Sequence, residues 1–236
     1  MQYISGLIRQ AVTEYNMIEN GDKVAVGVSG GKDSITLLAG LYKLKQYAGI
    51  DFELCAIIMD TCVNGENTDY LVIEKFCEER DIPCYIKRTE LWDIIFNVRK
   101  ESNPCSLCAI MRRGILHDMA KEYSCNKIAL GHHFDDAIET FFMNLFEEGR
   151  IGCFSPKSYL SRKDLYLIRP LIYAREREVI AAVKRNNLPV VKSLCPVDKT
   201  TQREETKKWI ATMCEKDPSF KKKIFGAMKR AHISEW

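Results

Sequence analysis

Residues 24–34 constrain the fold of this chain more than any other stretch, because they read as a strand, a glycine turn and the start of a helix. The run Val-Ala-Val-Gly-Val at residues 24–28 is short, apolar and bounded by Gly21-Asp22, which indicates a buried strand. A turn rich in glycine follows, and residues 34–47 have helical spacing. Backbone N–H groups in such a turn, together with the positive end of the helix dipole, favour an anion. We therefore expect a phosphate to bind at this turn.

The side chains of the turn add charge and hydroxyl groups to this anion site. Lys32 supplies a mobile positive charge, and Ser29 and Ser34 supply hydroxyl donors. The spacing excludes a Walker A loop, because only three residues separate Gly27 from Gly31, where that loop needs four. A dinucleotide-binding fingerprint does not match either.

The order Ser-Gly-Gly-Lys-Asp-Ser after a first strand resembles the signature of the PP-loop ATP pyrophosphatase superfamily. The resemblance implies an enzyme that splits ATP between its α- and β-phosphates and transfers AMP to an acceptor oxygen. It assigns ATP binding to the six motif residues Ser29, Gly30, Gly31, Lys32, Asp33 and Ser34. Lys32 and Asp33 are the expected catalytic residues of this motif. The alternative is a structural glycine turn.

Composition favours a soluble globular protein that acts in the cytoplasm. Of 236 residues, 46% are hydrophobic and 28% are charged, which is enough to build a core. We expect no membrane association, since no apolar run approaches the roughly 18 residues of a span and the first residues do not resemble a signal peptide. In a reducing compartment, the ten cysteines are expected to bind metal, act in catalysis or pack in the core rather than pair.

Short apolar runs alternate with amphipathic segments along most of the chain, which predicts an α/β fold. We expect a mostly parallel five-stranded sheet flanked by helices, with strands at residues 24–28, 52–59, 83–86, 127–130 and 165–168. The predicted organisation is an N-terminal helix in residues 1–22, an ATP-binding catalytic domain in residues 23–198 and a basic helical extension in residues 199–236. A Cys-x-x-Cys segment lies within the catalytic domain.

Polar residues follow the predicted strands at the edge where parallel sheets bind ligands. Met59 and Asp60 end the second strand, and Gly131 and His132 follow the fourth, so we expect all four to bind the nucleotide. The adjacent carboxylates of residues 135 and 136 are either helix N-cap groups or ligands of a Mg²⁺ ion on the triphosphate. PP-loop enzymes that modify tRNA carry a similar Gly-His-x-x-Asp-Asp element, which implies that Asp136 is the catalytic Mg²⁺ ligand.

A Cys-x-x-Cys pair, Cys105 and Cys108, is followed one helical turn later by Arg112. Such a pair grips a metal at two points and leaves zinc, iron–sulfur and redox uses open. Cys195 is a third cysteine in an exposed segment next to a proline. The other cysteines are expected to be buried packing residues.

Six segments resemble the tRNA 2-thiocytidine synthetase family, and the resemblance extends over about residues 24–195. They are Cys105–Cys108, Arg112-Arg113-Gly114, residues 131–139, Asn144-Leu145-Phe146, Ile168-Arg169-Pro170-Leu171 and Arg175-Glu176. Members hold a 4Fe-4S cluster on three cysteines, which implies Cys105, Cys108 and Cys195 here. The chain departs from the family where Ser193 replaces the first cysteine of a second pair.

This resemblance implies an ATP-dependent sulfurtransferase that adenylates a pyrimidine carbonyl oxygen, that of cytidine in tRNA, and replaces it with sulfur. AMP and pyrophosphate are the products, and Arg112 is expected to stabilise developing charge. The implied partners are tRNA or another pyrimidine-containing acceptor and a sulfur donor, either a cysteine desulfurase or free sulfide, and a homodimer is left open. The basic extension carries ten basic and five acidic residues and either contacts RNA or is a solvated helix face.

Three other functions stay open at this point. A PP-loop enzyme of the tRNA lysidine synthetase type would share the first two motifs but would leave the three cysteines without a role. A second alternative is an enzyme that performs the same thiolation or desulfuration chemistry on a different acceptor. A non-catalytic sensor of ATP and an iron–sulfur cluster would keep the binding sites alone.

Overall fold

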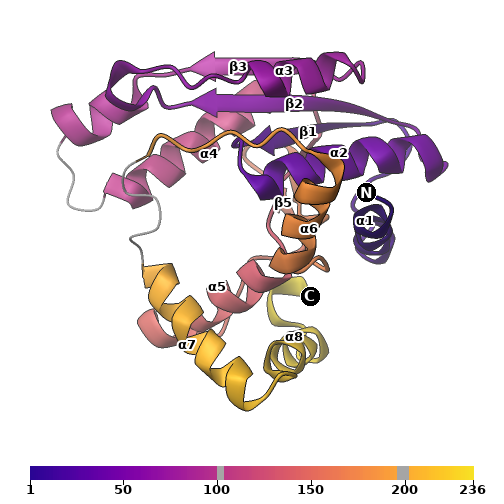
Figure 1. The fold of residues 1–236 in the computed structure, drawn as a ribbon, viewed down its shortest axis with the longest axis vertical. Helices are drawn as coiled ribbons and strands as arrows, with labels where there is room; N and C mark the ends of the chain where they lie inside the picture. Colours follow the sequence, from indigo (N-terminus) through magenta and orange to yellow (C-terminus); the bar gives the residue numbers. More distant parts are fainter. Residues whose placement is uncertain (100–103, 196–201) are drawn as a thin grey trace.

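The computed structural model describes residues 1–99, 104–195 and 202–236, which form an α/β fold around one sheet (Figure 1). The sheet has six strands in the order β3-β2-β1-β4-β6-β5. They are β1 (Asp22–Val28), β2 (Phe52–Asp60), β3 (Cys84–Arg88), β4 (Lys127–Ala129), β5 (Lys157–Leu160) and β6 (Leu165–Ile168). All neighbours pair in parallel except β5 and β6, which are antiparallel. The expected five strands are present, and β5 adds a sixth at the edge that the sequence pattern did not predict.

The order of the strands fixes where a ligand can bind. The chain builds outward from β1 through β2 to β3, then returns to place β4 on the other side of β1. Loops at the carboxyl ends of β1 and β4 therefore leave in opposite directions and open a crevice. Val28 ends β1 at the glycine turn, and Ala129 ends β4 two residues before Gly131. Both sequence motifs therefore lie at this crevice.

Helices cover the two faces of the sheet unequally. The larger core lies beneath the helices α1 (Gln2–Glu14), α2 (Lys32–Tyr47), α3 (Leu71–Glu78), α5 (Phe134–Glu147) and α6 (Glu176–Asn186). The smaller core lies beneath α4 (Pro104–Glu122), where Met119 and Ala120 belong to one hydrophobic cluster with Ile57 and Ile128 of the sheet. Among the described residues, no helix has both the length and the apolar character of a membrane span.

The sequence pattern predicts a helix over residues 109–122, and α4 begins five residues earlier, at Pro104. Proline favours the first turn of a helix, and Pro104 takes that place here. Cys105 and Cys108 consequently lie in the first turns of α4 rather than in a preceding loop. Before it come two short elements, η1 (Val63–Gly65) and the π-helix η2 (Asp93–Val98). The sequence also predicts a helix break at Asn103-Pro104, of which Asn103 lies outside the described residues and Pro104 begins α4.

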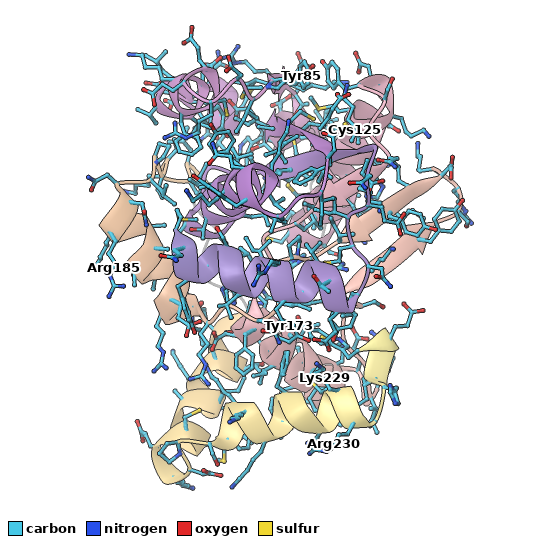
Figure 2. All side chains as sticks on the ribbon, turned by 90° about the vertical axis from the view of Figure 1, so that its right-hand side faces the viewer. Tyr85, Cys125, Tyr173, Arg185, Lys229 and Arg230 are labelled. Atoms are coloured by element: carbon cyan, nitrogen blue, oxygen red, sulfur yellow. The ribbon has the colours of Figure 1, made fainter. Side chains whose placement is uncertain are left out.

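The carboxyl-terminal extension forms α7 (Gln202–Lys216), α8 (Phe220–Arg230) and the short η3 (Ile233–Glu235), at the end of the molecule away from β2 and β3 (Figure 1). It packs on α5 through an aromatic cluster of Phe142, Phe146, Trp209 and Phe220. Lys229 also donates to the Tyr173 hydroxyl at 2.7 Å, and Figure 2 shows the two residues side by side. The predicted boundary between residues 198 and 199 lies outside the described residues.

Candidate active site

The glycine turn closes on itself through the hydroxyl of Ser34. This hydroxyl accepts a hydrogen bond from Ser29 N–H at 3.1 Å and donates to the Gly31 carbonyl at 3.0 Å. Ser34 is buried, so its side chain holds the turn in shape, while Ser29 lies at the surface of the site. Gly30 has a φ of +85°, a conformation that favours glycine. The residues between β1 and α2 therefore form a rigid cradle.

Two carboxylates hold the lysine of the cradle. Lys32 Nζ lies 3.0 Å from Asp33 Oδ2 and 3.3 Å from Glu176 Oε1. Burial alone would lower the pKa of Lys32, but these carboxylates outweigh burial and raise it. Lys207 of α7 binds the other oxygen of Glu176 at 2.9 Å. A phosphate in the cradle would meet a charged lysine that is already positioned. Glu176 had no predicted role, although it belongs to the Arg175-Glu176 segment that resembles the family, and it is the first residue of α6.

The turn after β4 packs directly on the cradle. A Cβ atom added to Gly131 would lie 3.0 Å from the backbone of Asp33 and of Ser34. The absence of a side chain at residue 131 thus permits close approach of two protein segments, in addition to the nucleotide binding expected for Gly131. His133 begins the next helix, and its Nε2 lies 3.6 Å from Asp33 Oδ1. The two motifs form one unit.

Asp136 takes part in capping α5 and also faces the carboxyl-terminal extension. Its backbone N–H donates to His133 Nδ1 at 3.3 Å, and its Oδ2 accepts from the His133 N–H at 2.8 Å. Its other oxygen, Oδ1, accepts from the Arg203 guanidinium of α7 at 3.2 Å. The N-cap alternative thus holds for one oxygen of Asp136. The other oxygen is bound by a side chain that a cation could replace.

Arg203 connects the extension to a second acid that the sequence analysis did not single out. Its Nε lies 3.8 Å from Glu139 Oε2. Burial raises the pKa of Glu139 to about 7, and nearby Asp136 adds to this, while Arg203 and Lys207 oppose it. A glutamate on the inner face of α5 gives little signal in sequence. Arg203 and Lys207 of α7 thus place positive charge beside three acids of the site, Asp136, Glu139 and Glu176.

A cavity of about 730 Å³ opens in front of the cradle. It brings together most of the expected site residues: Ser29, Gly31, Lys32, Asp33, Met59, Asp60, Cys105, Cys108, Arg112 and Cys195. The other expected residues do not line it, namely Gly30, Ser34, Gly131, His132 and Asp136. Trp92 and Phe96, which the sequence analysis missed, also line the cavity, and their rings stack with centroids 3.9 Å apart.

The carboxylate of Asp60 is already fully engaged with the protein. It accepts hydrogen bonds from Thr68 N–H at 2.8 Å, from the Thr68 hydroxyl at 3.1 Å and from Cys62 N–H at 3.2 Å. Asp60 is 2% exposed. These contacts close the loop after β2, so the carboxylate shapes the cavity wall and has little capacity left for a ligand.

The segment that carries Cys195 is held against the glycine turn by a backbone hydrogen bond. Val191 N–H donates to the Gly30 carbonyl at 2.9 Å, which holds the segment after α6 against the glycine turn. Figure 1 shows this segment running toward the amino-terminal end of α4. Burial raises the pKa of the Cys108 thiol, and the thiols of Cys195 and Cys105 add to that effect while Arg112 opposes it. Cys105 and Cys195 thus both act on Cys108, and all three cysteines line one cavity.

The donor chemistry of this cavity fits an iron–sulfur cluster. Within the described part of the chain, no three cysteine, histidine or acidic side chains have the spacing that holds a single metal ion. A cluster instead binds each thiolate to a different iron atom and therefore accepts a wider spacing than one ion does. Cys105, Cys108 and Cys195 line the same cavity and supply three soft sulfur donors, the ligand type that iron–sulfur clusters bind.

Comparison with known proteins agrees with this geometry. The family model for the PP-loop domain matches residues 5–209. The chain is 38% identical over 232 residues to the tRNA-cytidine(32) 2-sulfurtransferase of Citrifermentans bemidjiense, which covers 97% of this chain and 90% of that protein. It is 37% identical over 228 residues to the Geobacter sulfurreducens enzyme of the same name, covering 95% and 88%. The chain belongs to the tRNA-cytidine(32) 2-sulfurtransferase family of PP-loop proteins.

Two solved structures resemble this sulfurtransferase family member, and one of them is a tRNA thiolase. The U34-tRNA thiolase NcsA from Methanococcus maripaludis, solved with its [4Fe-4S] cluster, superposes with a TM-score of 0.78 and 27% identity. The match covers 98% of this chain and 78% of that one. The NH3-dependent NAD synthetase from Campylobacter jejuni shares the fold alone, with a TM-score of 0.51, 16% identity and coverage of 97% and 93%. The PP-loop fold expected from the sequence is confirmed.

Proposed function

We propose that this chain uses ATP to replace the 2-carbonyl oxygen of a cytidine in tRNA with sulfur. The observation that carries the proposal is the single cavity lined by the glycine turn and by three cysteines. A nucleotide phosphate and a sulfur source would meet in it. A PP-loop enzyme that uses an amine nucleophile would need the turn but would give no reason for the thiols.

The cradle residues bind and orient ATP in this proposal. Turn N–H groups and the charge of Lys32 face the β- and γ-phosphates and stabilise pyrophosphate as it leaves. Asp136 is the proposed ligand of Mg²⁺. When the ion binds, the Oδ1 atom of Asp136 would exchange its hydrogen bond from Arg203 for the ion. The carbonyl oxygen of the base attacks the α-phosphorus, so an O–P bond forms and the bond to pyrophosphate breaks.

Sulfide then attacks the activated carbon. A C–S bond forms, the C–O bond breaks, and the oxygen leaves as part of AMP, which is a far better leaving group than the free carbonyl oxygen. Cys105, Cys108 and Cys195 would hold a [4Fe-4S] cluster, whose fourth iron lacks a protein ligand and can bind sulfide when the cluster is present. Arg112 lies on the cavity wall one turn after Cys108 and stabilises negative charge on the departing phosphate.

The proposal is tested with anaerobically reconstituted protein, ATP, Mg²⁺, sodium sulfide and an unmodified tRNA transcript. We expect 2-thiocytidine in the digested RNA, with AMP and pyrophosphate in equal amounts. A Cys108→Ser variant should lose both the visible absorbance and the product. ATP hydrolysis with no thionucleoside in the RNA would contradict the proposal, and a base joined to an amine would indicate lysidine-type chemistry instead.

A further inference from the structure

Arg169 is a buried arginine to which the mechanism above gives no role. It follows β6 directly, and its side chain is 8% exposed. Its Nε donates to His132 Nδ1 at 3.2 Å, another guanidinium nitrogen donates to the Ser155 carbonyl, and the group lies 4.8 Å from the centroid of the Phe154 ring. These contacts fix the guanidinium firmly in position.

No negative charge balances this arginine in the described part of the chain, where no carboxylate lies within ion-pair distance of Arg169. Burial lowers its pKa to about 10, the thiol of Cys153 opposes this, and the neighbouring Arg113 lowers it further. A buried charge is costly unless a partner compensates it. The fold therefore places a rigid cation where an anion from outside the chain would be stabilised.

Two further donors surround the same point. His132 accepts at Nδ1, so its proton lies on Nε2, and burial with the nearby arginines lowers the pKa of His132 to about 3. The imidazole is therefore a neutral N–H donor. Arg113 is exposed on α4, and Leu116, one turn further along this helix, lies beside Leu130, two residues before His132, because both leucines pack against Gly27. The positive charge of Arg113 lowers the pKa of both His132 and Arg169. Within the described residues, Arg113 has no ion-pair partner either.

The position of this cluster relative to the cavity indicates its ligand. Arg112 lines the cavity, whereas the next residue of α4, Arg113, does not. His132 follows Gly131, which packs on the backbone of Asp33 and Ser34, so the cluster adjoins the site. None of Arg113, His132 and Arg169 lines the cavity that holds Lys32. A nucleotide base inside the cavity leaves its own phosphodiester at the rim. Arginines bind phosphate through charge-assisted, paired hydrogen bonds.

We propose that Arg113, His132 and Arg169 bind a backbone phosphate of the RNA whose base enters the cavity. This inference rests on the proposed function, because it takes RNA as the substrate. The ATP phosphates bind separately, at the cradle. Arg169 and His132 supply fixed donors, and Arg113 supplies an exposed charge that meets the RNA first.

The test is tRNA binding measured at several salt concentrations with an unmodified transcript and anaerobically purified full-length protein. Arg113→Gln should weaken binding about five- to tenfold at fixed salt and reduce the salt slope by about 0.7 to 1, the share of one phosphate contact. Arg169→Lys keeps the charge but loses the planar fork, so affinity should fall with little change in slope. ATP affinity should stay unchanged in both.

The control is Arg185→Gln, because Arg185 is an exposed arginine on α6 that points away from the protein (Figure 2). It should bind tRNA as the wild type does. Wild-type affinity and slope in Arg113→Gln would overturn the inference, even if Arg169→Lys failed to fold. Loss of ATP affinity with unchanged tRNA binding would also overturn it, by assigning the cluster to the nucleotide. If the variants change tRNA affinity and its salt slope as expected, but the wild-type protein forms no thionucleoside, only the proposed function would be overturned.

Discussion

Replacing Gly131 by alanine perturbs the contact that joins the two motifs. The added Cβ would lie 3.0 Å from the Asp33 carbonyl carbon and the Ser34 nitrogen, and 3.2 Å from the Asp33 oxygen. All three atoms belong to the backbone at the start of α2, so no flexible side chain can move aside. Ordinary contacts need several tenths of an ångström more, and relieving such overpacking costs about 1–3 kcal/mol. Because the backbone of Asp33 and Ser34 is part of the cradle, the substitution would also shift the cradle.

Urea unfolding and ATP titration measure the two parts of this effect. We expect Gly131→Ala to lower the free energy of unfolding by about 1–3 kcal/mol and to weaken ATP binding as well. Gly6→Ala is the matched control, because Gly6 lies in α1 with no atom within 4 Å of its added Cβ. Helix propensity predicts that this control stabilises the protein by about 0.5–1 kcal/mol. A Gly131→Ala protein with wild-type stability and ATP affinity would refute the reasoning.

Three further variants test separate contacts. Asp135→Asn should lower the free energy of unfolding by about 1–3 kcal/mol at pH 7, because the mutation removes the ion pair with Lys221. Burial tends to raise the pKa of Asp135, but the Lys221 ammonium outweighs burial and lowers it. This stabilisation is present above the unfolded pKa of about 4 and is lost as pH falls through the lower folded value, so the difference should vanish in acid melts. Arg203→Gln should raise the pKa of Glu139 above about 7, as read by carboxyl NMR titration. Cys195→Ser should lose the cluster absorbance while still binding ATP.

Each of these variants has a control or an opposing outcome. Asp118→Asn removes an exposed ion pair with Lys163 and should change stability by less than about 1 kcal/mol. A cost of Asp135→Asn that stays the same down to pH 2 would exclude the ion pair as its cause. An unshifted Glu139 in Arg203→Gln would show that α7 does not act on it. Cys214→Ser, outside the cavity lining, should keep the absorbance.

The sequence predicted the parts of the fold that depend on local pattern. The strand, turn and helix around the cradle follow from β-branched residues, glycines and helical spacing. The edge strand β5 was missed because its residues are mostly half-buried and show no clear alternation of apolar and polar side chains. The start of α4 was misplaced because Pro104 was interpreted as a break, whereas proline is also a favoured first residue.

Other features of the site depend on contacts between segments far apart in the chain. Nothing near Glu176 indicates that it pairs with Lys32, which lies 144 residues earlier. The sequence likewise could not show that Arg203 of the extension binds Asp136, or that Ser34 turns inward. In the extension, three basic residues form ion pairs with acids of α5 and α6: Arg203 with Asp136, Lys207 with Glu176 and Lys221 with Asp135. Part of the basic excess of the extension therefore serves to dock it on these helices.

The most direct test of the account follows one oxygen atom. A tRNA transcript made with cytidine labelled with oxygen-18 at the 2-carbonyl is thiolated by the reconstituted protein, and the nucleotide product is analysed by mass spectrometry. The account predicts that each 2-thiocytidine formed is matched by one AMP that carries the heavy oxygen in its phosphate. Unlabelled AMP, with the heavy oxygen found in water, would contradict adenylation of the base and with it the shared cavity for ATP and sulfur.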